Sequence, residues 1–181
     1  MDLSGILFNP RGRINPAEFW RGLIMLIGAS ILITVISAYS PLAVASILGI
    51  ASILLIYPLI CVYGKRFHDT GRTAWLVILV FIAYMAISMI LTAVLTPVLA
   101  PEFAAFQTDL QEKIASGEVG FVEGMELAQA QSSGAPVLVM TIVTTLIASL
   151  LTGFIVARLA SDPDENEHGM PSGGVAGGTF E

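Results

Sequence analysis

The chain has 181 residues, of which 55% are hydrophobic and only 12% are charged. Soluble domains usually contain about 25% charged residues, so this composition excludes an ordinary soluble domain. The net charge of −6, with only 8 basic residues, excludes a basic nucleic-acid-binding face. Because Cys61 is the single cysteine, an intramolecular disulfide is also excluded.

The N-terminal segment carries the signals that start a helix. Asn15 is a favourable N-cap, Pro16 suits the first helical position, and Glu18 stands where a capping-box carboxylate is expected. The helix that we expect to begin at Pro16 leads directly into an apolar stretch. Trp20 then lies at the level of the lipid headgroups, where aromatic rings anchor helices.

Four long apolar stretches follow, and each predicts a membrane-spanning helix. Each has close to or more than the roughly 20 residues needed to cross about 30 Å of hydrocarbon. Backbone groups in the bilayer core must pair within their own segment, which requires a helix. We expect Ser40 to cap the second helix and Pro58 to kink it. The predicted spans are residues 20–39, 41–63, 75–99 and 136–159.

The basic residues predict how the spans are threaded. Lys113 alone lies between the third and fourth spans, whereas the other basic residues lie on the opposite side. The positive-inside rule then places both termini in the cytoplasm. Lipid phosphates or a partner are the expected contacts of Arg11 and Arg13. The cytoplasmic basic residues are Arg11, Arg13, Arg21, Lys65, Arg66, Arg72 and Arg158.

The loop between the second and third spans contains neighbouring His68 and Asp69. A carboxylate beside an imidazole suggests acid–base chemistry or a metal ligand. One histidine and one carboxylate make a poor metal site, and no nucleophile accompanies them, so an architectural role is favoured. The loop residues expected to contact structure, lipid or a partner are Lys65, Arg66, His68, Asp69, Arg72 and Trp75.

The architectural interpretation assigns a role to each polar residue of this loop. Asp69 or Thr70 would accept backbone N–H groups in a tight turn, while Gly71 supplies a positive φ. Thr73 would cap the third span. Asp69 would also form an ion pair with either Arg13 or Arg72, tying the N-terminal segment to the loop.

Residues 100–135, between the third and fourth spans, contain six acidic residues and are expected to lie outside. An apolar stripe at spacings of three, four and four predicts an amphipathic helix there. It would rest on the outer membrane interface or cap the helix bundle, with partner docking as the alternative. A second short helix is expected over residues 122–131. The stripe consists of Phe103, Phe106, Leu110 and Ile114.

The last part of the chain, residues 161–181, is rich in Asp, Glu, Pro, Ser and Gly. Such a segment cannot bury a core, so we expect a flexible cytoplasmic tail, disordered at least beyond Pro171, after a four-helix membrane domain of residues 1–160. The spans are almost free of ionisable groups, and their interior polar groups are Ser, Thr and Tyr. That pattern argues against an ion-coupled transporter.

At its two motifs the chain resembles a group of bacterial integral membrane proteins, the domain of unknown function 805 family. The resemblance rests on residues 12–15 (GRIN) with residues 18–20 (EFW), and on residues 65–72 (KRFHDTGR) with Trp75. Residues 165–171 (ENEHGMP) resemble a degraded form of the family's ending. The resemblance implies a location in the bacterial cytoplasmic membrane, and it implies no reaction.

We therefore expect an all-α, four-span membrane protein with no catalytic residue, metal or cofactor. The leading functional expectation is a structural or accessory role beside a larger membrane complex or in a homo-oligomer, with membrane lipids as further partners. The alternative is a small transporter, channel or ligand-binding protein, with a Ser/Thr-lined path gated near Pro58. An enzymatic interpretation would use His68 and Asp69 at a lipid-facing cytoplasmic site.

Overall fold

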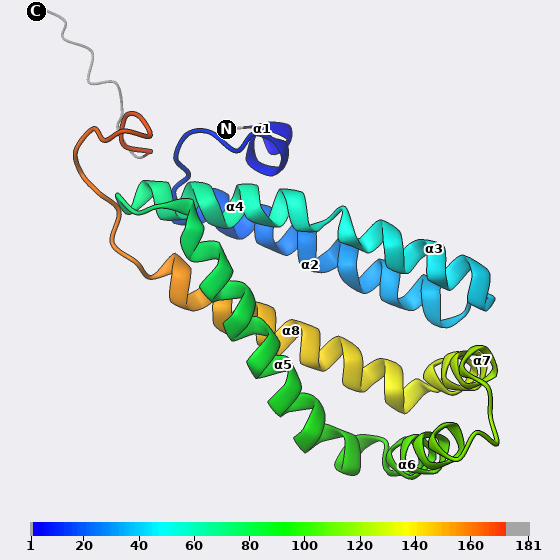
Figure 1. The fold of residues 1–181 in the computed structure, drawn as a ribbon. Helices are drawn as coiled ribbons and strands as arrows, with labels where there is room; N and C mark the ends of the chain where they lie inside the picture. The colour runs from blue at the N-terminus through cyan, green and yellow to red at the C-terminus, as the bar shows by residue number, and fades with distance from the viewer. Residues whose placement is uncertain (1, 173–181) are drawn as a thin grey trace, which may run out of the picture. The chain divides into compact units, whose positions relative to one another are not determined.

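The computed structural model describes residues 2–172, and in this range it is helical and without β-strands (Figure 1). The expected all-α class is therefore confirmed. The helices are α1 (Leu3–Phe8), α2 (Pro16–Ala38), α3 (Leu42–Ile53), α4 (Ile56–Asp69), the 3-10 turn η1 (Ala74–Leu76), α5 (Val77–Leu99), α6 (Pro101–Ala115), α7 (Phe121–Ser132) and α8 (Ala135–Ala157).

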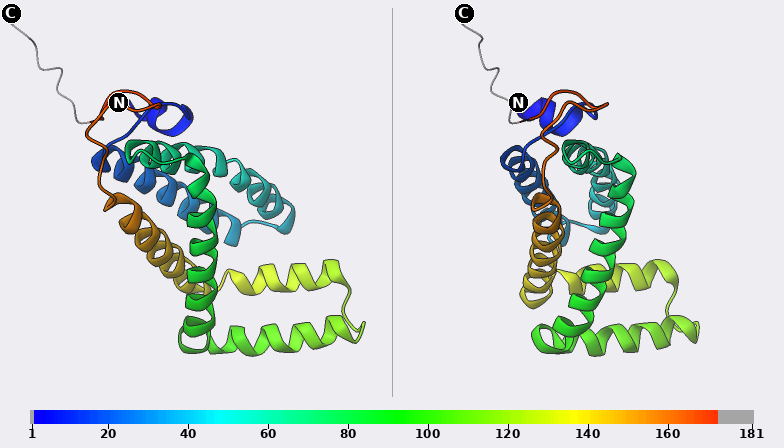
Figure 2. Two further views of the ribbon diagram at one scale, coloured as in Figure 1. Left: turned by 60° about the vertical axis from the view of Figure 1, so that its left-hand side comes forward. Right: turned by 90° about the vertical axis from the view of Figure 1, so that its left-hand side faces the viewer.

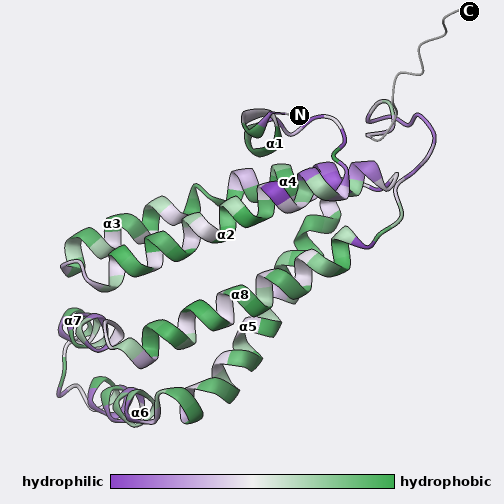
Figure 3. Ribbon diagram, turned by 180° about the vertical axis from the view of Figure 1, so that it is seen from behind, coloured by the Kyte–Doolittle hydropathy of each residue, from purple (hydrophilic) through white to green (hydrophobic). Residues whose placement is uncertain are grey.

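Four helical segments are long and apolar enough to cross a membrane, which confirms the four expected spans. Hydrophobic residues line most of α2, α3, α5 and α8, whereas hydrophilic ones gather at the C-terminal end of α4 (Figure 3). The segments are Pro16–Ala38, Leu42–Asp69, Ala74–Leu99 and Ala135–Ala157.

The start of α2 has the reciprocal capping box that the sequence predicts. The Asn15 side-chain oxygen accepts the Glu18 backbone N–H at 2.9 Å, and the Glu18 carboxylate accepts the Asn15 backbone N–H at 3.2 Å. Ser40 does not cap the next helix. Its hydroxyl donates to the Ile36 carbonyl at 2.7 Å, which occupies a backbone acceptor that the end of α2 leaves unpaired.

The second span is interrupted, as Pro58 predicts. α3 ends at Ile53 and α4 begins at Ile56. Proline has no N–H to donate to the residue four positions earlier, and its ring clashes with that residue's carbonyl. For Pro58 that residue is Leu54, which lies in the interruption.

The chain divides into two compact units, and the boundaries pass through α2, α5 and α8. Unit 1 contains Met1–Gly28, Ile53–Tyr84 and Ser149–Glu181, and unit 2 contains Ala29–Ser52 and Met85–Ala148.

Unit 1 is held together by close packing of α2 against α1, α4 and α8. The Phe19 ring meets Tyr63 of α4 edge-on at 5.1 Å, and the Tyr63 hydroxyl lies 3.4 Å from the Thr152 hydroxyl of α8. Gly22 permits the approach of α2 to α1 and α4, because a Cβ there would lie 2.8 Å from Ile6 and 2.9 Å from Val62. Gly28, on the same helix, has nothing comparable within 4 Å.

Unit 2 contains the predicted amphipathic helix and the expected second short helix, observed as α6 and α7. Both views of Figure 2 show these two helices side by side. Leu110 is buried, and Ile114 approaches Gly124 of α7 so closely that a Cβ there would lie 2.8 Å from its side chain. Phe103 packs against a small core of Ala100, Val137 and Met140.

Of the apolar stripe of α6, Leu110 is buried, Phe103 and Phe106 are half-buried, and Ile114 is 38% exposed. Phe106, the fourth stripe residue, stacks on Phe103 with ring centroids 6.4 Å apart. Capping of the bundle and docking of a partner both stay predictions for this face. A hydrogen bond also joins α7 to the C-terminal part of α2: the Gln129 side-chain amide donates to the Ser37 carbonyl at 2.7 Å.

Candidate functional site: the Asp69 cluster

Four charged side chains are buried at one end of unit 1, and together we call them the Asp69 cluster: Arg13, Lys65, Arg66 and Asp69. Arg13 is 6% exposed, and the other three are fully buried. Burial of charge is costly unless each group is paired and hydrogen-bonded. The cluster therefore depends on the partners that its side chains find.

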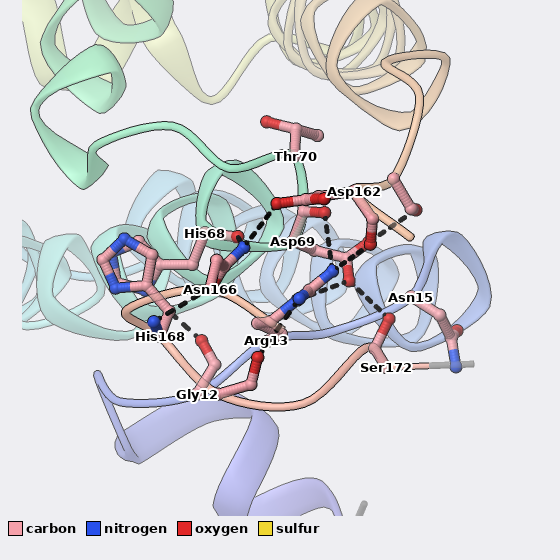
Figure 4. A network of polar contacts seen from close by, with 12 residues as sticks. Gly12, Arg13, Asn15, His68, Asp69, Thr70, Asp162, Asn166, His168 and Ser172 are labelled. Atoms are coloured by element: carbon pink, nitrogen blue, oxygen red, sulfur yellow. Dashed lines mark hydrogen bonds and ion pairs between the residues drawn. The ribbon is translucent and has the colours of Figure 1, made fainter. Parts of the chain in front are cut away.

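The Asp69 carboxylate is the centre of the cluster (Figure 4). One oxygen accepts from Arg13 Nε at 3.3 Å and from the Ser172 hydroxyl at 2.6 Å. The other accepts from Arg66 at 2.5 Å and from the Ser161 hydroxyl at 2.6 Å. A carboxylate has about four acceptor positions, so these four donors use its full capacity.

Arg13 connects the N-terminal segment to the residues after α8. Besides Asp69, its guanidinium donates to the carbonyls of Asp164 at 2.8 Å, Gly169 at 3.2 Å and Asp162 at 2.5 Å. The Asp69 carbonyl accepts from Arg13 at 3.2 Å and from the Asp162 backbone N–H at 2.7 Å. The planar, five-donor guanidinium suits this role because it reaches several acceptors at once.

The other two cations each satisfy the end of a helix. Arg66 donates to the carbonyls of Ala157 and Leu159 at the end of α8. Lys65 donates to the carbonyl of Ile6 at 2.7 Å and to that of Gly5, both in α1. The last carbonyls of a helix have no partner within the helix and carry partial negative charge, so cations there are favourable.

Residues 161–172 make polar contacts with the cluster, and the disorder predicted for the tail, at least beyond Pro171, stays a prediction. Asn166 donates through its side-chain amide to the His68 carbonyl at 3.2 Å and to the Asp162 carboxylate at 3.0 Å. The pKa of Asp162 is lowered mainly by this amide, then by the Asp164 backbone N–H and by the charge of Arg13. Charged and polar partners thus replace the apolar core that the segment lacks. Residues 173–181 lie outside the described range.

His68 and Asp69 point to different partners. The His68 ring stacks on His168 with centroids 3.7 Å apart and ring planes 10° apart, and its Nδ1 lies 3.3 Å from the Gly12 carbonyl (Figure 4). His168 Nε2 lies 3.3 Å from Glu167. In residues 2–172 no group of three or more His, Cys, Asp or Glu residues is arranged to hold a metal ion.

The structure unites some of the residues that the sequence singled out and separates others. Asp69 pairs with Arg13, as one of the two alternatives predicted, and its second cation is Arg66 rather than Arg72. Arg11, Arg72 and Trp75 are exposed. Trp20 is half-buried, and its ring lies against Gly153 of α8.

The turn after α4 differs partly from its predicted hydrogen bonding. Gly71 has φ +69° and Thr73 accepts the Trp75 N–H at 3.4 Å, as expected. Neither Asp69 nor Thr70 accepts backbone N–H groups of the turn through its side chain. The Thr70 hydroxyl instead donates to the Phe67 carbonyl at 2.8 Å. The Asp69 carboxylate accepts from two arginines and two serines.

Sequence reasoning missed Ser161, Asp162, Asn166, His168 and Ser172 as members of the site. Their composition, typical of a disordered segment, concealed them. The number of donors on Arg13 and Arg66 could have indicated these further partners. Once buried, the two guanidinium groups require more acceptors than a single carboxylate provides.

Together the fold and the cluster define a class: a multi-pass helical membrane protein with a buried ionic cluster at one polar end. A family model described as "Protein of unknown function (DUF805)" matches residues 7–170. The chain belongs to this family. Comparisons with curated proteins and with solved structures gave no match. The matched range reaches Met170, so it includes most of the segment that Arg13 holds.

Proposed function

We propose that the protein is a non-enzymatic structural or accessory subunit of a complex in the bacterial cytoplasmic membrane. The observation that carries the proposal is the complete internal engagement of the Asp69 carboxylate by Arg13, Arg66 and two serines. A carboxylate in catalysis must reach a substrate or exchange a proton. Here it joins the N-terminal segment, α4 and residues 161–172.

The distribution of exposed charge supports a cytoplasmic location for both ends of the chain. Arg11, Arg21, Arg72 and Arg158 are exposed in unit 1, the unit that contains the Asp69 cluster. Lys113, in α6 of unit 2, pairs with Asp109 at 2.8 Å. By the positive-inside rule, the exposed arginines face the cytoplasm, where anionic lipid headgroups attract them.

The exposure of the third span supports packing against another protein. Only 6% of an apolar 18-residue stretch of this span is buried, compared with 39% of the corresponding stretch of the fourth span. Met89 and Ile90 of α5 are 70% and 64% exposed. A larger membrane protein or a second copy of the chain would cover such a face through van der Waals packing.

Co-purification tests the proposal. The full chain would be isolated from native membranes in a mild detergent, and the proteins retained would be identified by mass spectrometry. A stoichiometric membrane protein is expected, lost when Met89→Trp and Ile90→Trp are combined. Ile24→Trp is the matched control, since Ile24 is 60% exposed on α2. Recovery of the chain alone, in monomeric form, would contradict the accessory role.

One observation favours the alternative of a ligand-binding membrane protein. A groove of about 610 Å³ lies in unit 2, between α5 and α6, and its lining is rich in hydroxyl and amide groups. The Ser88 hydroxyl at this groove is buried without a hydrogen-bond partner among the described residues. Under this alternative, Ser88→Leu would abolish function while leaving co-purification unchanged. The polar lining residues are Ser88, Thr92, Thr96, Gln107, Thr108 and Gln111.

A further inference from the structure

A second groove, in unit 1, is apolar and lies between α4 and the start of α5. It has a volume of about 620 Å³, within the range of roughly 300–1,000 Å³ typical of ligand pockets. At one end the lining changes to His68, Thr73 and Trp75. The apolar walls are formed by Ile56, Leu59, Ile60, Val77, Ile78 and Phe81.

The length of this groove matches one leaflet of a bilayer. Ile56 and His68 are twelve positions apart on α4. At about 1.5 Å per residue they are separated by roughly 18 Å along the helix. Half of a hydrocarbon core of about 30 Å is roughly 15 Å. A single acyl chain that enters at His68 would therefore end near Ile56, the first residue of α4.

The walls of the groove are open to the surroundings. Ile60 and Ile78 are 44% and 51% exposed, although both lie in segments that qualify as membrane spans. Val77, in contrast, is buried and forms part of the floor. An exposed apolar groove within two spans faces lipid chains, so its most abundant neighbour is an acyl chain.

The polar end of the groove combines an interfacial tryptophan with a neighbouring arginine, the groups that a phospholipid headgroup requires. Trp75 is 77% exposed at the rim, and its indole N–H suits the membrane interface. Arg72 does not itself line the groove, but it is exposed and is the sequence neighbour of the lining residue Thr73. Unlike Arg13 and Arg66, whose guanidinium groups are enclosed in the Asp69 cluster, Arg72 is accessible to an external phosphate.

We propose that this groove is a binding site for one anionic phospholipid. One acyl chain lies along Ile60 and Ile78, and the phosphate is held near Arg72 and Trp75. His68, near the C-terminal end of α4, lines the site, so a bound lipid would support the same end of unit 1 that the Asp69 cluster holds. The proposal requires a membrane location, and it does not depend on an accessory role.

The test measures retained lipid. The full chain would be reconstituted in vesicles of equal phosphatidylglycerol and phosphatidylcholine, extracted in mild detergent and examined by native mass spectrometry. We expect one retained lipid per chain, with phosphatidylglycerol enriched at least about fivefold. Ile78→Phe should fill the groove and abolish retention. Its matched control is Ile82→Phe, because Ile82 is 57% exposed on the same helix and does not line the groove.

The headgroup is tested separately. Arg72→Gln should remove the preference for phosphatidylglycerol while a lipid is still retained, and Arg158→Gln should leave the preference intact. Equal retention of the two lipids by the unchanged chain would overturn the proposal, as would equal retention by Ile78→Phe and Ile82→Phe. Photo-crosslinking from position 78 to a polypeptide in native membranes would also overturn it, because the groove would then be a protein interface.

Discussion

Replacing Asp69 with alanine should destabilise unit 1 by at least about 3 kcal/mol. The Asp69 side chain is fully buried, and its two ion-pair partners, Arg13 and Arg66, each have only 1% of their side chain exposed. Removing one partner of a buried ion pair typically costs about 3–5 kcal/mol, because the remaining charge is left uncompensated. Solvent screening reduces this figure little, because these three side chains are at most 1% exposed. A loss of that size is a large part of the roughly 5–15 kcal/mol that stabilises a typical protein.

The assay is reversible unfolding of the purified chain in mixed micelles, followed by tryptophan fluorescence as the fraction of denaturing detergent rises. Asp164→Ala is the matched control. Asp164 is exposed and contributes its backbone carbonyl, rather than its carboxylate, to Arg13. The control should change the free energy of unfolding by less than about 0.5 kcal/mol. Equal stability of the Asp69→Ala and Asp164→Ala chains would refute an architectural role for the cluster.

Three further predictions concern packing and the segment after α8. Gly22→Ala should lower the free energy of unfolding by about 1–3 kcal/mol, because the added Cβ would overpack the contact of α2 with α1 and α4. Gly28→Ala should not lower it, because a Cβ at Gly28 would have no neighbour within 4 Å. The same detergent titration measures both variants. His168→Ala should increase the mobility of a spin label at Met170→Cys more than His168→Phe, which preserves a stacked ring. Because the pKa of Asp162 is lowered, its contribution to holding this segment is present above its ordinary value of 3.8 and is lost as pH falls below it. The mobility of the same label should therefore rise on acidification, and Asp162→Asn should reduce that dependence.

The spans could be predicted from sequence because hydropathy and chain length act locally. Each apolar stretch must pair its backbone groups within itself, so no knowledge of its neighbours is needed. The capping box at Asn15 and Glu18 is local for the same reason and was found where predicted. The interruption near Pro58 follows from the covalent structure of proline alone.

The site was only partly predictable because its contacts join distant parts of the chain. The Arg13–Asp69 pair was one of two open alternatives, and local sequence gave no basis to choose between Arg13 and Arg72. The contacts from Arg13 to the segment after α8 span about 150 residues. A segment such as residues 161–172 has the composition of a disordered tail, and it is ordered by buried arginines elsewhere rather than by its own hydrophobicity.

The most direct test of the account is hydrogen–deuterium exchange of residues 161–172 in the chain reconstituted in nanodiscs. We expect backbone amides there, Asp162 above all, to be protected, since its N–H donates to the Asp69 carbonyl at 2.7 Å. Arg13→Ala should abolish that protection, while Arg11→Ala should preserve it. Exchange at the rate of an unstructured peptide in the unchanged chain would contradict the account.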